Sequence, residues 1–562
     1  MSRFAKLYTK ESQNVGKIPW NVYPRPQLER DSYLCLNGEW DFSIEENAEN
    51  LPKFDKKILV PFSPETLLSG VEQVPDEKSV LCYKRSFSLP KGFKKEKVLL
   101  HFGAVDQYAT ILLNGKTVGH HSGGYEHFSF DVTSFIEEEN TLTVFVTDTL
   151  NDCLLPYGKQ SKKRGGMWYT PTSGIWQTVW LESVNDEHIE DIKITTKKNR
   201  VEIKVTPKLS GRVELLGKSL ELIKGKADFA VLNPNMWSPE SPYLYYFKIV
   251  TKKDEVKSYF ALRDLEIRSF KGKKRLFLNG KPYFFHGLLD QGYFSDGGLT
   301  PATPKCFEDD ILAMKSLGFN MLRKHIKVEP EQFYYDCDRL GMVVFQDMVN
   351  SSDYSFLRDT ALPTIGFIRR SDRGMHKNKI SRQNFIEHME QTVKSLYNHP
   401  SICYWTIFNE GWGQFSSSEM YDRLKKIDKT RFVDSASGWF LGGKSDVESR
   451  HVYFKKVKFP KTDKPFVLSE FGGYSFKPKG HVFNTEKTYG YGKFENREDF
   501  VVALRKLYVE EILPLKEKGL CATVYTQVSD IEDETNGLLS YDRQVLKVEK
   551  NEFLDISEKL CK

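Results

Sequence analysis

Two glutamates, Glu410 and Glu470, stand where apolar runs end and glycine-containing turns begin. Glu410 lies in "TIFNEGWG" (406–413) and Glu470 in "VLSEFGG" (467–473). A pair of carboxylates across a cleft can hydrolyse a glycosidic bond, because one donates a proton to the leaving oxygen while the other attacks or stabilises the anomeric carbon. The glycines beside each glutamate would let a ligand approach. The alternative is structural, since either glutamate could form a buried ion pair with an Arg or a Lys.

This chemistry requires the two carboxyl groups to differ in protonation. Opposite environments push their pKa values apart, so that one stays protonated and the other ionised. A separation of ~5–5.5 Å leads to retention of configuration through a covalent glycosyl-enzyme, whereas a wider gap leads to inversion. The sequence alone does not provide this separation.

Strands and helices alternate in the C-terminal part of the chain, which is the pattern of a TIM (β/α)8 barrel. The helix expected over residues 303–318 places Phe307, Ile311 and Met314 on one face, and Thr303 can cap its start. Further helices are expected over residues 331–341 and 382–397, and eight strands over residues 283–290, 319–325, 342–348, 402–410, 431–437, 451–454, 466–473 and 521–530.

Chemistry in such barrels lies at the carboxyl ends of the strands, and polar residues follow almost every strand expected here. Trp412 could stack on the aglycone. Each candidate has the alternative of a packing role, and Arg323 could pair with Asp347 or Glu470 rather than touch substrate. The candidate substrate-binding residues are Asn409, Asp290, Gln291, Arg323, His325, Gln346, Asp347, Trp439, His451, Tyr453 and Gln527.

Short strands separated by turns dominate the N-terminal half. Asn114-Gly115, between two strand-like runs, predicts a tight hairpin. Neither expected sandwich carries a catalytic motif, so both should buttress the barrel and supply loops; the segment 162–174 is a candidate to reach the active site. The expected domains are a jelly-roll β-sandwich (1–185), an immunoglobulin-like β-sandwich (186–266) and the TIM barrel (267–562).

The composition argues against several classes of function. The net charge of +6 over 562 residues comes without a basic stripe, so nucleic-acid binding is not expected. No run approaches the ~18 apolar residues of a membrane span, and the N-terminus has no apolar core of signal-peptide length. The eight cysteines are scattered, which favours a reducing compartment and a cytoplasmic location over a disulfide framework or a zinc site.

A metal-dependent barrel hydrolase is a weaker alternative. His325, His451 and Asp290 could converge, but no H-x-H or HExxH spacing supports a metal site. We therefore expect neither a metal ion nor a cofactor, and carbohydrate as the substrate.

Longer motifs resemble glycoside hydrolase family 2, the family of bacterial β-galactosidases, β-glucuronidases and β-mannosidases. "FNEGWG" and "LSEFGG" resemble its two catalytic segments. Three further segments resemble, in order, the closing strand of its sugar-binding jelly roll, its entry to the barrel, and its second to third barrel strands: "TSGIWQTVWLE" (172–182), "RLFLNGKPYFFHGLLDQG" (275–292) and "NMLRKHIKVEPEQFYYDCDRLGMVVFQDM" (320–348).

The resemblance implies a role for each central residue. Glu410 would be the general acid/base and Glu470 the nucleophile of a retaining exo-β-glycosidase. Asn409 would hydrogen-bond the sugar 2-hydroxyl, and Tyr453 would orient the nucleophile. Homo-oligomers are common in the family, although this sequence shows no interface.

Departures from the family pattern bear on the sugar. The β-glucuronidases carry an Asn-x-Lys element near strand eight that grips the sugar carboxylate. This chain has "SDIEDETNGLLSYDR" (529–543) instead, with Leu538 where the lysine would be useful. Acidic surroundings should repel a uronate, which favours a β-galactosidase.

Alternatives to a β-galactosidase remain open. Arg323, Lys324, Arg369 or Arg370 could replace the missing lysine, so a β-hexuronidase (glucuronidase or galacturonidase), a β-mannosidase or a furanosidase could use the same machinery. A non-catalytic carbohydrate-binding protein is least favoured, because it would need a lost carboxylate and both are present.

Overall fold

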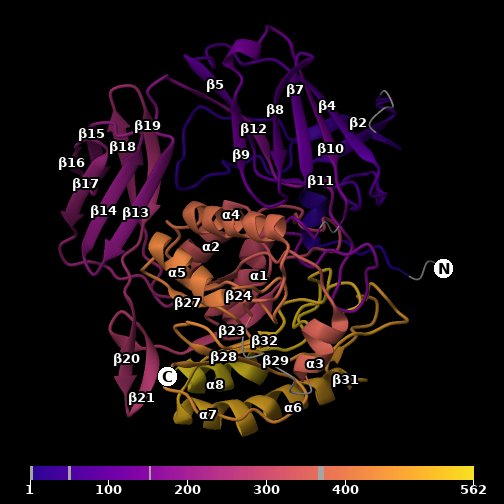
Figure 1. The fold of residues 1–562 in the computed structure, drawn as a ribbon, viewed down its shortest axis with the longest axis vertical. Helices are drawn as coiled ribbons and strands as arrows, with labels where there is room; N and C mark the ends of the chain where they lie inside the picture. Colours follow the sequence, from indigo (N-terminus) through magenta and orange to yellow (C-terminus); the bar gives the residue numbers. More distant parts are fainter. Residues whose placement is uncertain (1–3, 48–51, 151–152, 365–371, 562) are drawn as a thin grey trace.

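The computed structural model describes residues 4–47, 52–150, 153–364 and 372–561. Two β-sandwiches, coloured indigo to magenta in Figure 1, lie above and to the left of a barrel of strands and helices that extends to the C-terminus. This is the order of domains expected from the change in strand and helix pattern.

The N-terminal sandwich packs a six-stranded sheet against a four-stranded sheet. Leu142, Val144 and Val146 alternate with more exposed residues along β10, because one face of the sheet covers the shared core. Asn114 and Gly115 both have positive φ between β7 and β8, which confirms the predicted hairpin. The sheet orders are β3-β2-β4-β10-β7-β8 and β1-β12-β5-β9, with β6 and β11 paired separately. The strands are β1 (Leu34–Cys35), β2 (Gly38–Glu45), β3 (Lys56–Val60), β4 (Val80–Phe87), β5 (Lys97–Phe102), β6 (Val105–Asp106), β7 (Tyr108–Leu113), β8 (Lys116–Ser122), β9 (Phe128–Asp131), β10 (Asn140–Thr147), β11 (Gly174–Ile175) and β12 (Val179–Val184).

The middle domain is a smaller antiparallel sandwich with its own core. Its sheets have the orders β13-β14-β17 and β16-β15-β18-β19. Asn398 of the barrel fixes its position, because the side chain accepts from Ile194 N at 2.7 Å and donates to Ile192 O at 2.6 Å. The strands are β13 (Asp191–Lys197), β14 (Arg200–Thr206), β15 (Gly211–Leu215), β16 (Lys218–Leu222), β17 (Lys226–Ala230), β18 (Tyr245–Thr251) and β19 (Glu255–Phe260).

Eight parallel strands form the barrel, in the order β27-β26-β25-β24-β23-β32-β29-β28. Near-continuous apolar runs make these strands, because both faces are covered, by the interior on one side and by the helices on the other. All eight strands expected from the sequence are present. They are β23 (Phe285–Asp290), β24 (Met321–Lys324), β25 (Val343–Asp347), β26 (Ile402–Thr406), β27 (Phe432–Asp434), β28 (Glu448–Val452), β29 (Phe466–Gly472) and β32 (Leu520–Thr526). Shorter strands outside the barrel are β20 (Leu265–Phe270), β21 (Lys273–Leu278), β22 (Lys281–Pro282), β30 (Tyr474–Phe476) and β31 (Gly492–Phe494).

Helices cover the outside of the barrel with the predicted apolar faces. Phe307, Ile311 and Met314 of α1 are buried. The predicted cap is wrong, because the Thr303 hydroxyl donates to Glu11 Oε2 instead of capping the helix. The helices are α1 (Lys305–Ser316), α2 (Glu331–Leu340), α3 (Leu362–Thr364), α4 (Lys379–Ser395), α5 (Ser417–Ile427), α6 (Arg497–Leu507), α7 (Leu513–Lys518) and α8 (Lys550–Cys561), with shorter or irregular turns η1 (Lys10–Asn14), η2 (Thr133–Phe135), η3 (Phe356–Ala361) and η4 (Tyr508–Ile512).

Candidate active site

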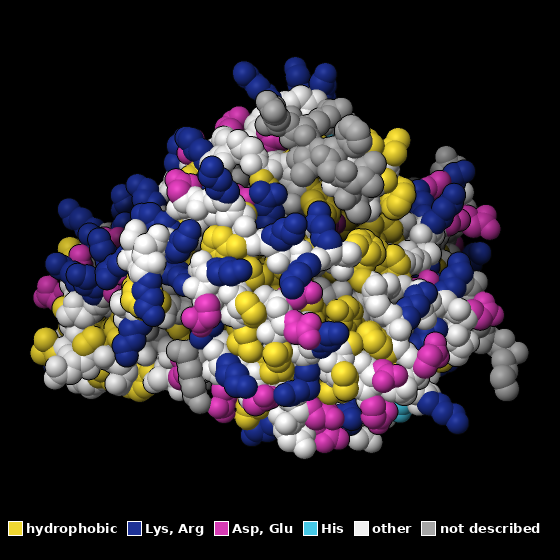
Figure 2. Space-filling model, turned by 90° about the horizontal axis from the view of Figure 1, so that it is seen from below, with side chains coloured by type: hydrophobic (Ala, Val, Ile, Leu, Met, Phe, Trp, Pro, Cys, Tyr) yellow, Lys and Arg dark blue, Asp and Glu magenta, His cyan; other side chains and the backbone are white. Residues whose placement is uncertain are grey.

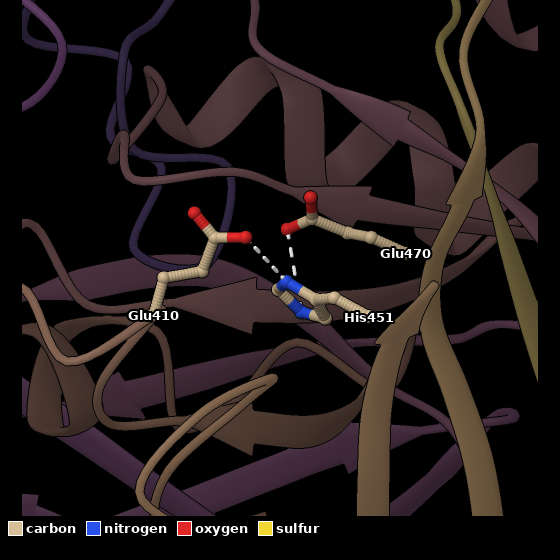
Figure 3. A group of neighbouring side chains, drawn as sticks. All are labelled: Glu410, His451 and Glu470. Carbon is tan, nitrogen blue, oxygen red and sulfur yellow. Dashed lines mark hydrogen bonds and ion pairs between the residues drawn. The ribbon is translucent and has the colours of Figure 1, made fainter. Parts of the chain in front are cut away.

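Side chains from three strand ends meet at the carboxyl-terminal mouth of the barrel (Figure 3). Glu470 lies within β29, His451 within β28, and Glu410 just beyond the end of β26. His451 stands between the carboxylates, with Nδ1 2.8 Å from Glu410 Oε1 and Nε2 3.5 Å from Glu470 Oε1. One oxygen of each glutamate and one ring nitrogen of His451 all lie within 4.8 Å of one another. The two carboxylates therefore face each other across a short gap.

A turn after β26 aims Glu410 into the mouth. Its backbone has a left-handed φ of 51°, and its N–H donates to Ser437 O at 2.9 Å. Gly411 follows with φ 77°, and a Cβ there would come within 2.3 Å of the Phe440 ring. Only glycine combines this positive φ with so close an approach to the Phe440 ring without strain, so residue 411 helps to determine where Glu410 points.

The glycines beside the glutamates accommodate protein neighbours rather than a ligand. A Cβ on Gly472 would lie 2.2 Å from the Tyr525 ring, and one on Gly473 would lie 2.4 Å from the Tyr491 ring. The expectation that these glycines leave room for a sugar is therefore wrong. They allow close packing around the turns that carry Glu410 and Glu470.

The surroundings of Glu470 favour an ionised carboxylate. Its burial would raise the pKa, but the nearby His451 and Arg323 and the hydrogen bond from Tyr453 outweigh burial and lower the pKa. Arg323 Nη1 donates to Oε1 at 3.0 Å, and the Tyr453 hydroxyl donates to Oε2 at 2.5 Å. Both oxygens are thus held in place, as a nucleophilic carboxylate requires.

Glu410 has a different environment from Glu470. Its side chain is 13% exposed, against 6% for Glu470. Among the residues that the structure describes, no Arg or Lys nitrogen comes within 4.0 Å of it, and His451 supplies its hydrogen bond. The second Glu410 oxygen points away from the imidazole ring (Figure 3). The two carboxylates therefore differ in charge compensation, which is the asymmetry that acid/base and nucleophile roles need.

Arg323 of β24 connects the components of the site. It is 1% exposed, its Nε donates to Asp347 Oδ1 at 2.9 Å, and its Nη2 donates to Asn409 Oδ1 at 2.8 Å. With the bond to Glu470, it makes both ion pairs that the sequence left open. Its donors are committed to protein atoms, so Arg323 acts on the orientation of Asn409 and Glu470 rather than as an open sugar contact.

His325 and Asp347 form a buried pair beside this arginine. His325 Nδ1 lies 2.7 Å from Asp347 Oδ2. Burial alone would raise the pKa of Asp347, but Arg323 and His325 lower it, while burial lowers the pKa of His325. Asp347 is thus an anion that holds the side chains of Arg323 and His325 in place.

One candidate substrate contact is contradicted by the structure. Gln346 is fully buried, its Oε1 accepts from the Tyr334 hydroxyl at 2.7 Å, and its Nε2 donates to two backbone carbonyls at 2.8 Å. Every polar atom of the amide is occupied, so Gln346 is a packing residue of the barrel wall. Asp290 is likewise ion-paired, with Lys324 at 2.7 Å.

Other candidates are placed around the mouth. Gln291 Nε2 donates to Gln527 Oε1 at 2.6 Å, which joins the ends of β23 and β32. Trp439 is half-buried, with its ring 5.8 Å from His451. Tyr453 stacks on Tyr491 at 3.9 Å.

Trp412 is not free to stack on an aglycone. It is 2% exposed, and Trp168 of the jelly-roll domain stacks on it at 5.5 Å. Tyr354 contacts both rings edge-on. The half-buried Trp168 therefore takes the outward position predicted for Trp412, and the segment 162–174 does reach the mouth of the barrel.

Family models match three consecutive parts of the chain. "Glycosyl hydrolases family 2, sugar binding domain" matches residues 34–183, "Glycosyl hydrolases family 2" matches 178–263, and "Glycosyl hydrolases family 2, TIM barrel domain" matches 270–481. The chain belongs to glycosyl hydrolase family 2.

Relatives within the family differ in the sugar that their names specify. A β-galactosidase of Thermoanaerobacter pseudethanolicus is 24% identical over 492 residues, which cover 80% of this chain and 62% of that protein. A β-glucuronidase of Bacteroides fragilis is 22% identical over 411 residues, covering 67% and 56%. The matched region thus spans about 60% of the length of these relatives. The solved structure of a β-D-glucuronidase from Dictyoglomus thermophilum has a TM-score of 0.74 at 18% identity and covers 96% of this chain and 98% of that one.

The donor set at the mouth of the barrel does not favour a metal ion. Glu410, His451 and Glu470 are close enough to share a cation. However, Arg323 already supplies a positive charge 3.0 Å from Glu470, and the imidazole already contacts both carboxylates. Among the described residues, the group that could hold a metal does not include Asp290 or His325, which pair with Lys324 and Asp347.

Pattern-based reasoning missed Lys159 and Tyr491, and it named the segment that carries Trp168 without singling out that residue. Lys159 and Trp168 come from the jelly-roll domain, and Tyr491 from the segment after β30. Aromatic residues in the loop 153–174 were the available indication, since "MWY" lies in a loop rather than in a strand. No local pattern indicates which side chain of such a loop turns towards the barrel.

The surface mixes charged and hydrophobic side chains. On the face shown in Figure 2, Lys and Arg side chains are interspersed with acidic and hydrophobic ones. Within the described ranges, no helix is both long and apolar enough to cross a membrane.

Proposed function

We propose that the protein is a retaining exo-β-glycosidase that removes terminal β-linked sugars by double displacement. The observation that supports this most directly is that one oxygen of Glu410 and one oxygen of Glu470 lie within 4.8 Å of each other. Retaining enzymes place their carboxyl groups ~5–5.5 Å apart, whereas inverting enzymes need ~6.5–9.5 Å to admit a water. The short gap favours attack by a carboxylate over attack by a water.

The two glutamates then have separate roles. Glu410 donates a proton to the glycosidic oxygen while a Glu470 oxygen bonds to the anomeric carbon and the aglycone leaves as an alcohol. In the second step Glu410 takes a proton from water, the water oxygen bonds to the anomeric carbon, and the bond to Glu470 breaks. The lowered pKa of Glu470 supports this assignment, as does the lack of an Arg or Lys within 4.0 Å of Glu410 among the described residues.

The neighbouring residues support binding in one orientation. Arg323 fixes the Asn409 amide at its Oδ1, so the Nδ2 is left to donate to a sugar hydroxyl beside the acid/base. The Tyr453 hydroxyl orients the nucleophile by donating to Glu470 Oε2, while Arg323 donates to Oε1. Trp168, together with Arg164 ion-paired to Glu532 and Asp533, brings the jelly-roll loop over one side of the mouth, which suits cleavage at a chain end.

The sugar remains a β-galactoside by the prediction from the sequence, with a β-hexuronide as the second candidate. The acids that argued against a uronate are largely compensated: Asp530 pairs with Lys547, and Glu532 and Asp533 pair with Arg164. Repulsion from this segment is therefore weaker than its sequence indicates. Of the cations considered as replacements, Lys324 is ion-paired, and Arg369 and Arg370 lie outside the described residues.

The test is an assay on a panel of 4-nitrophenyl β-glycosides with the wild type, Glu410→Gln and Glu470→Gln. We expect at least one neutral or acidic β-glycoside to be cleaved, both variants to lose orders of magnitude in kcat/KM, and NMR of the first product formed to show the β-anomer. Release of the α-anomer would contradict double displacement. A Glu470→Gln variant that keeps its activity would remove Glu470 as nucleophile.

A further inference from the structure

One cation at the mouth of the barrel makes no ion pair with a described residue. Lys159 is 7% exposed, and it lies between the jelly-roll loop and the barrel. Across the described ranges, its ammonium makes no ion pair within 4.0 Å and no hydrogen bond, and its recorded contact is with the Trp412 ring, 5.2 Å away. The other buried cations at this end of the barrel are compensated, Arg323 by Asp347 and Glu470, and Lys324 and Lys327 by Glu329.

The position of Lys159 is fixed by its backbone rather than by a side-chain partner. Its carbonyl accepts from Tyr169 N at 3.0 Å, and the next residue, Gln160, holds Asp106 and the Thr172 N–H. The side chain is thus delivered to the mouth by a braced loop. The Lys159 side chain is largely buried, and its ammonium makes no ion pair with a described residue, so an anion bound at the mouth would gain a charge-assisted contact that no described protein group takes up.

The groups around Lys159 place it at the carboxyl-terminal mouth of the barrel. Its charge acts on His325, which follows β24, and on Glu534, which follows β32. Glu534 is itself held by other donors, the Tyr169 hydroxyl at 2.9 Å and Gln527 Nε2 at 2.7 Å. Trp412, beneath the ammonium, is two residues from Glu410. Lys159 therefore borders the same mouth as the two carboxylates.

We propose that Lys159 binds an anionic group on the glycone, so that the enzyme prefers an acidic sugar, one carrying a carboxylate or a phosphate, to a neutral one. The inference rests on the proposed glycosidase function and would replace the predicted β-galactoside by its charged counterparts. The cation comes from the sandwich domain, and one domain thus supplies the chemistry while the other supplies selectivity for charge.

The experiment compares kcat/KM of wild type, Lys159→Gln, Lys159→Met and Lys159→Arg. The substrates are 4-nitrophenyl β-D-galacturonide, β-D-glucuronide and β-D-galactoside 6-phosphate, with the neutral β-D-galactoside and β-D-glucoside as references. We expect Lys159→Gln and Lys159→Met to lose roughly 10- to 100-fold on the anionic substrate that the wild type prefers, the usual worth of one charge-assisted hydrogen bond. The kcat/KM of these variants on the neutral substrates should change by less than about twofold. Lys159→Arg should retain most of the preference for the anionic substrate. Comparison of the uronides with the phosphate identifies the anion.

Two controls separate binding from structure. Lys163→Gln removes an exposed lysine of the same loop and should change nothing. Lys159→Met removes an unpaired buried charge, so it should raise rather than lower the unfolding temperature even as selectivity is lost. A lower unfolding temperature with equal losses on all substrates would show that Lys159 is a structural residue and would overturn the inference.

The remaining outcomes also decide the question. A wild type that cleaves only neutral glycosides refutes the inference and leaves the glycosidase function intact. If nothing on the panel is cleaved, calorimetry with sodium D-galacturonate, D-glucuronate and D-galactose 6-phosphate tests Lys159 independently of catalysis. Binding of one anion by the wild type and not by Lys159→Gln supports the inference, and equal or absent binding refutes it.

Discussion

Replacing Tyr453 with phenylalanine should raise the pKa of Glu470 and shift the acidic limb of the pH–activity profile. The Tyr453 hydroxyl donates to Glu470 Oε2 at 2.5 Å, and this bond favours the ionised carboxylate. Without it, burial is opposed by His451, Arg323 and His325. The pKa of Glu470 should therefore rise from its lowered value towards that of an ordinary carboxyl group.

The size of the shift follows from the strength of one bond. A charge-assisted hydrogen bond contributes ~1.5–3 kcal/mol, and one pKa unit corresponds to about 1.36 kcal/mol, so we expect a rise of about 1–2 units. The double displacement needs ionised Glu470, and activity is lost as the pH falls through its pKa. A higher pKa therefore moves the acidic limb of kcat/KM to higher pH by the same amount.

The assay is kcat/KM for the best 4-nitrophenyl glycoside between about pH 4 and pH 8, read after quenching in alkali. Tyr491→Phe is the matched control, because that ring stacks on Tyr453 at 3.9 Å while its hydroxyl makes no recorded bond to Glu470. Its acidic limb should stay with the wild type. If Tyr453→Phe lowers activity but leaves the limb in place, the hydroxyl acts on the substrate or the fold, and the argument about ionisation is refuted.

Three further changes test other parts of the site. Glu410→Gln should lower kcat/KM by ~10²–10⁴-fold on alkyl glycosides. The rate of the first step on 4-nitrophenyl glycosides should fall much less, because their leaving group needs no proton. Equal losses on both kinds of substrate would contradict the role of Glu410 as the acid. Arg323→Met leaves two buried carboxylates without their cation and should lower the free energy of unfolding by ~3–5 kcal/mol in chemical denaturation, and an unchanged midpoint would count against the network. Gly411→Ala forces a Cβ to within 2.3 Å of the Phe440 ring at a φ of 77°, so it should cost ~1–3 kcal/mol and lower kcat, whereas Gly374→Ala, with open space around its Cβ, should be tolerated.

The periodic spacing of apolar residues predicted most of the architecture. Apolar runs bounded by polar residues predicted all eight barrel strands, and the spacing of Phe307, Ile311 and Met314 predicted the buried face of α1. These patterns are local, since strand and helix faces repeat every two and 3.6 residues. The two glutamates were also visible, because each stands where such a run ends.

The interactions that give those glutamates different properties were not visible. Arg323 joins Asp347, Asn409 and Glu470 across the barrel, and only closure of the strands decides which carboxylates share one guanidinium. The roles of Gln346 and Trp412 were mistaken for the same reason. Residue type indicated a sugar contact in both cases, whereas burial and the packing of neighbouring residues excluded it.

The charged residues in the loops show most clearly the difference between what the sequence determines and what the tertiary structure decides. By itself the sequence determined the barrel, the two sandwiches and the pair of carboxylates, because these depend on residue types at short, regular spacings. The tertiary structure alone decided that Glu532 and Asp533 after β32 are compensated by Arg164, 368 residues away from Glu532, and that Lys159 makes no ion pair with any residue that the structure describes. Pairing at that distance along the chain depends on how whole domains dock, and the energy of a charge depends on its neighbours in space rather than in sequence.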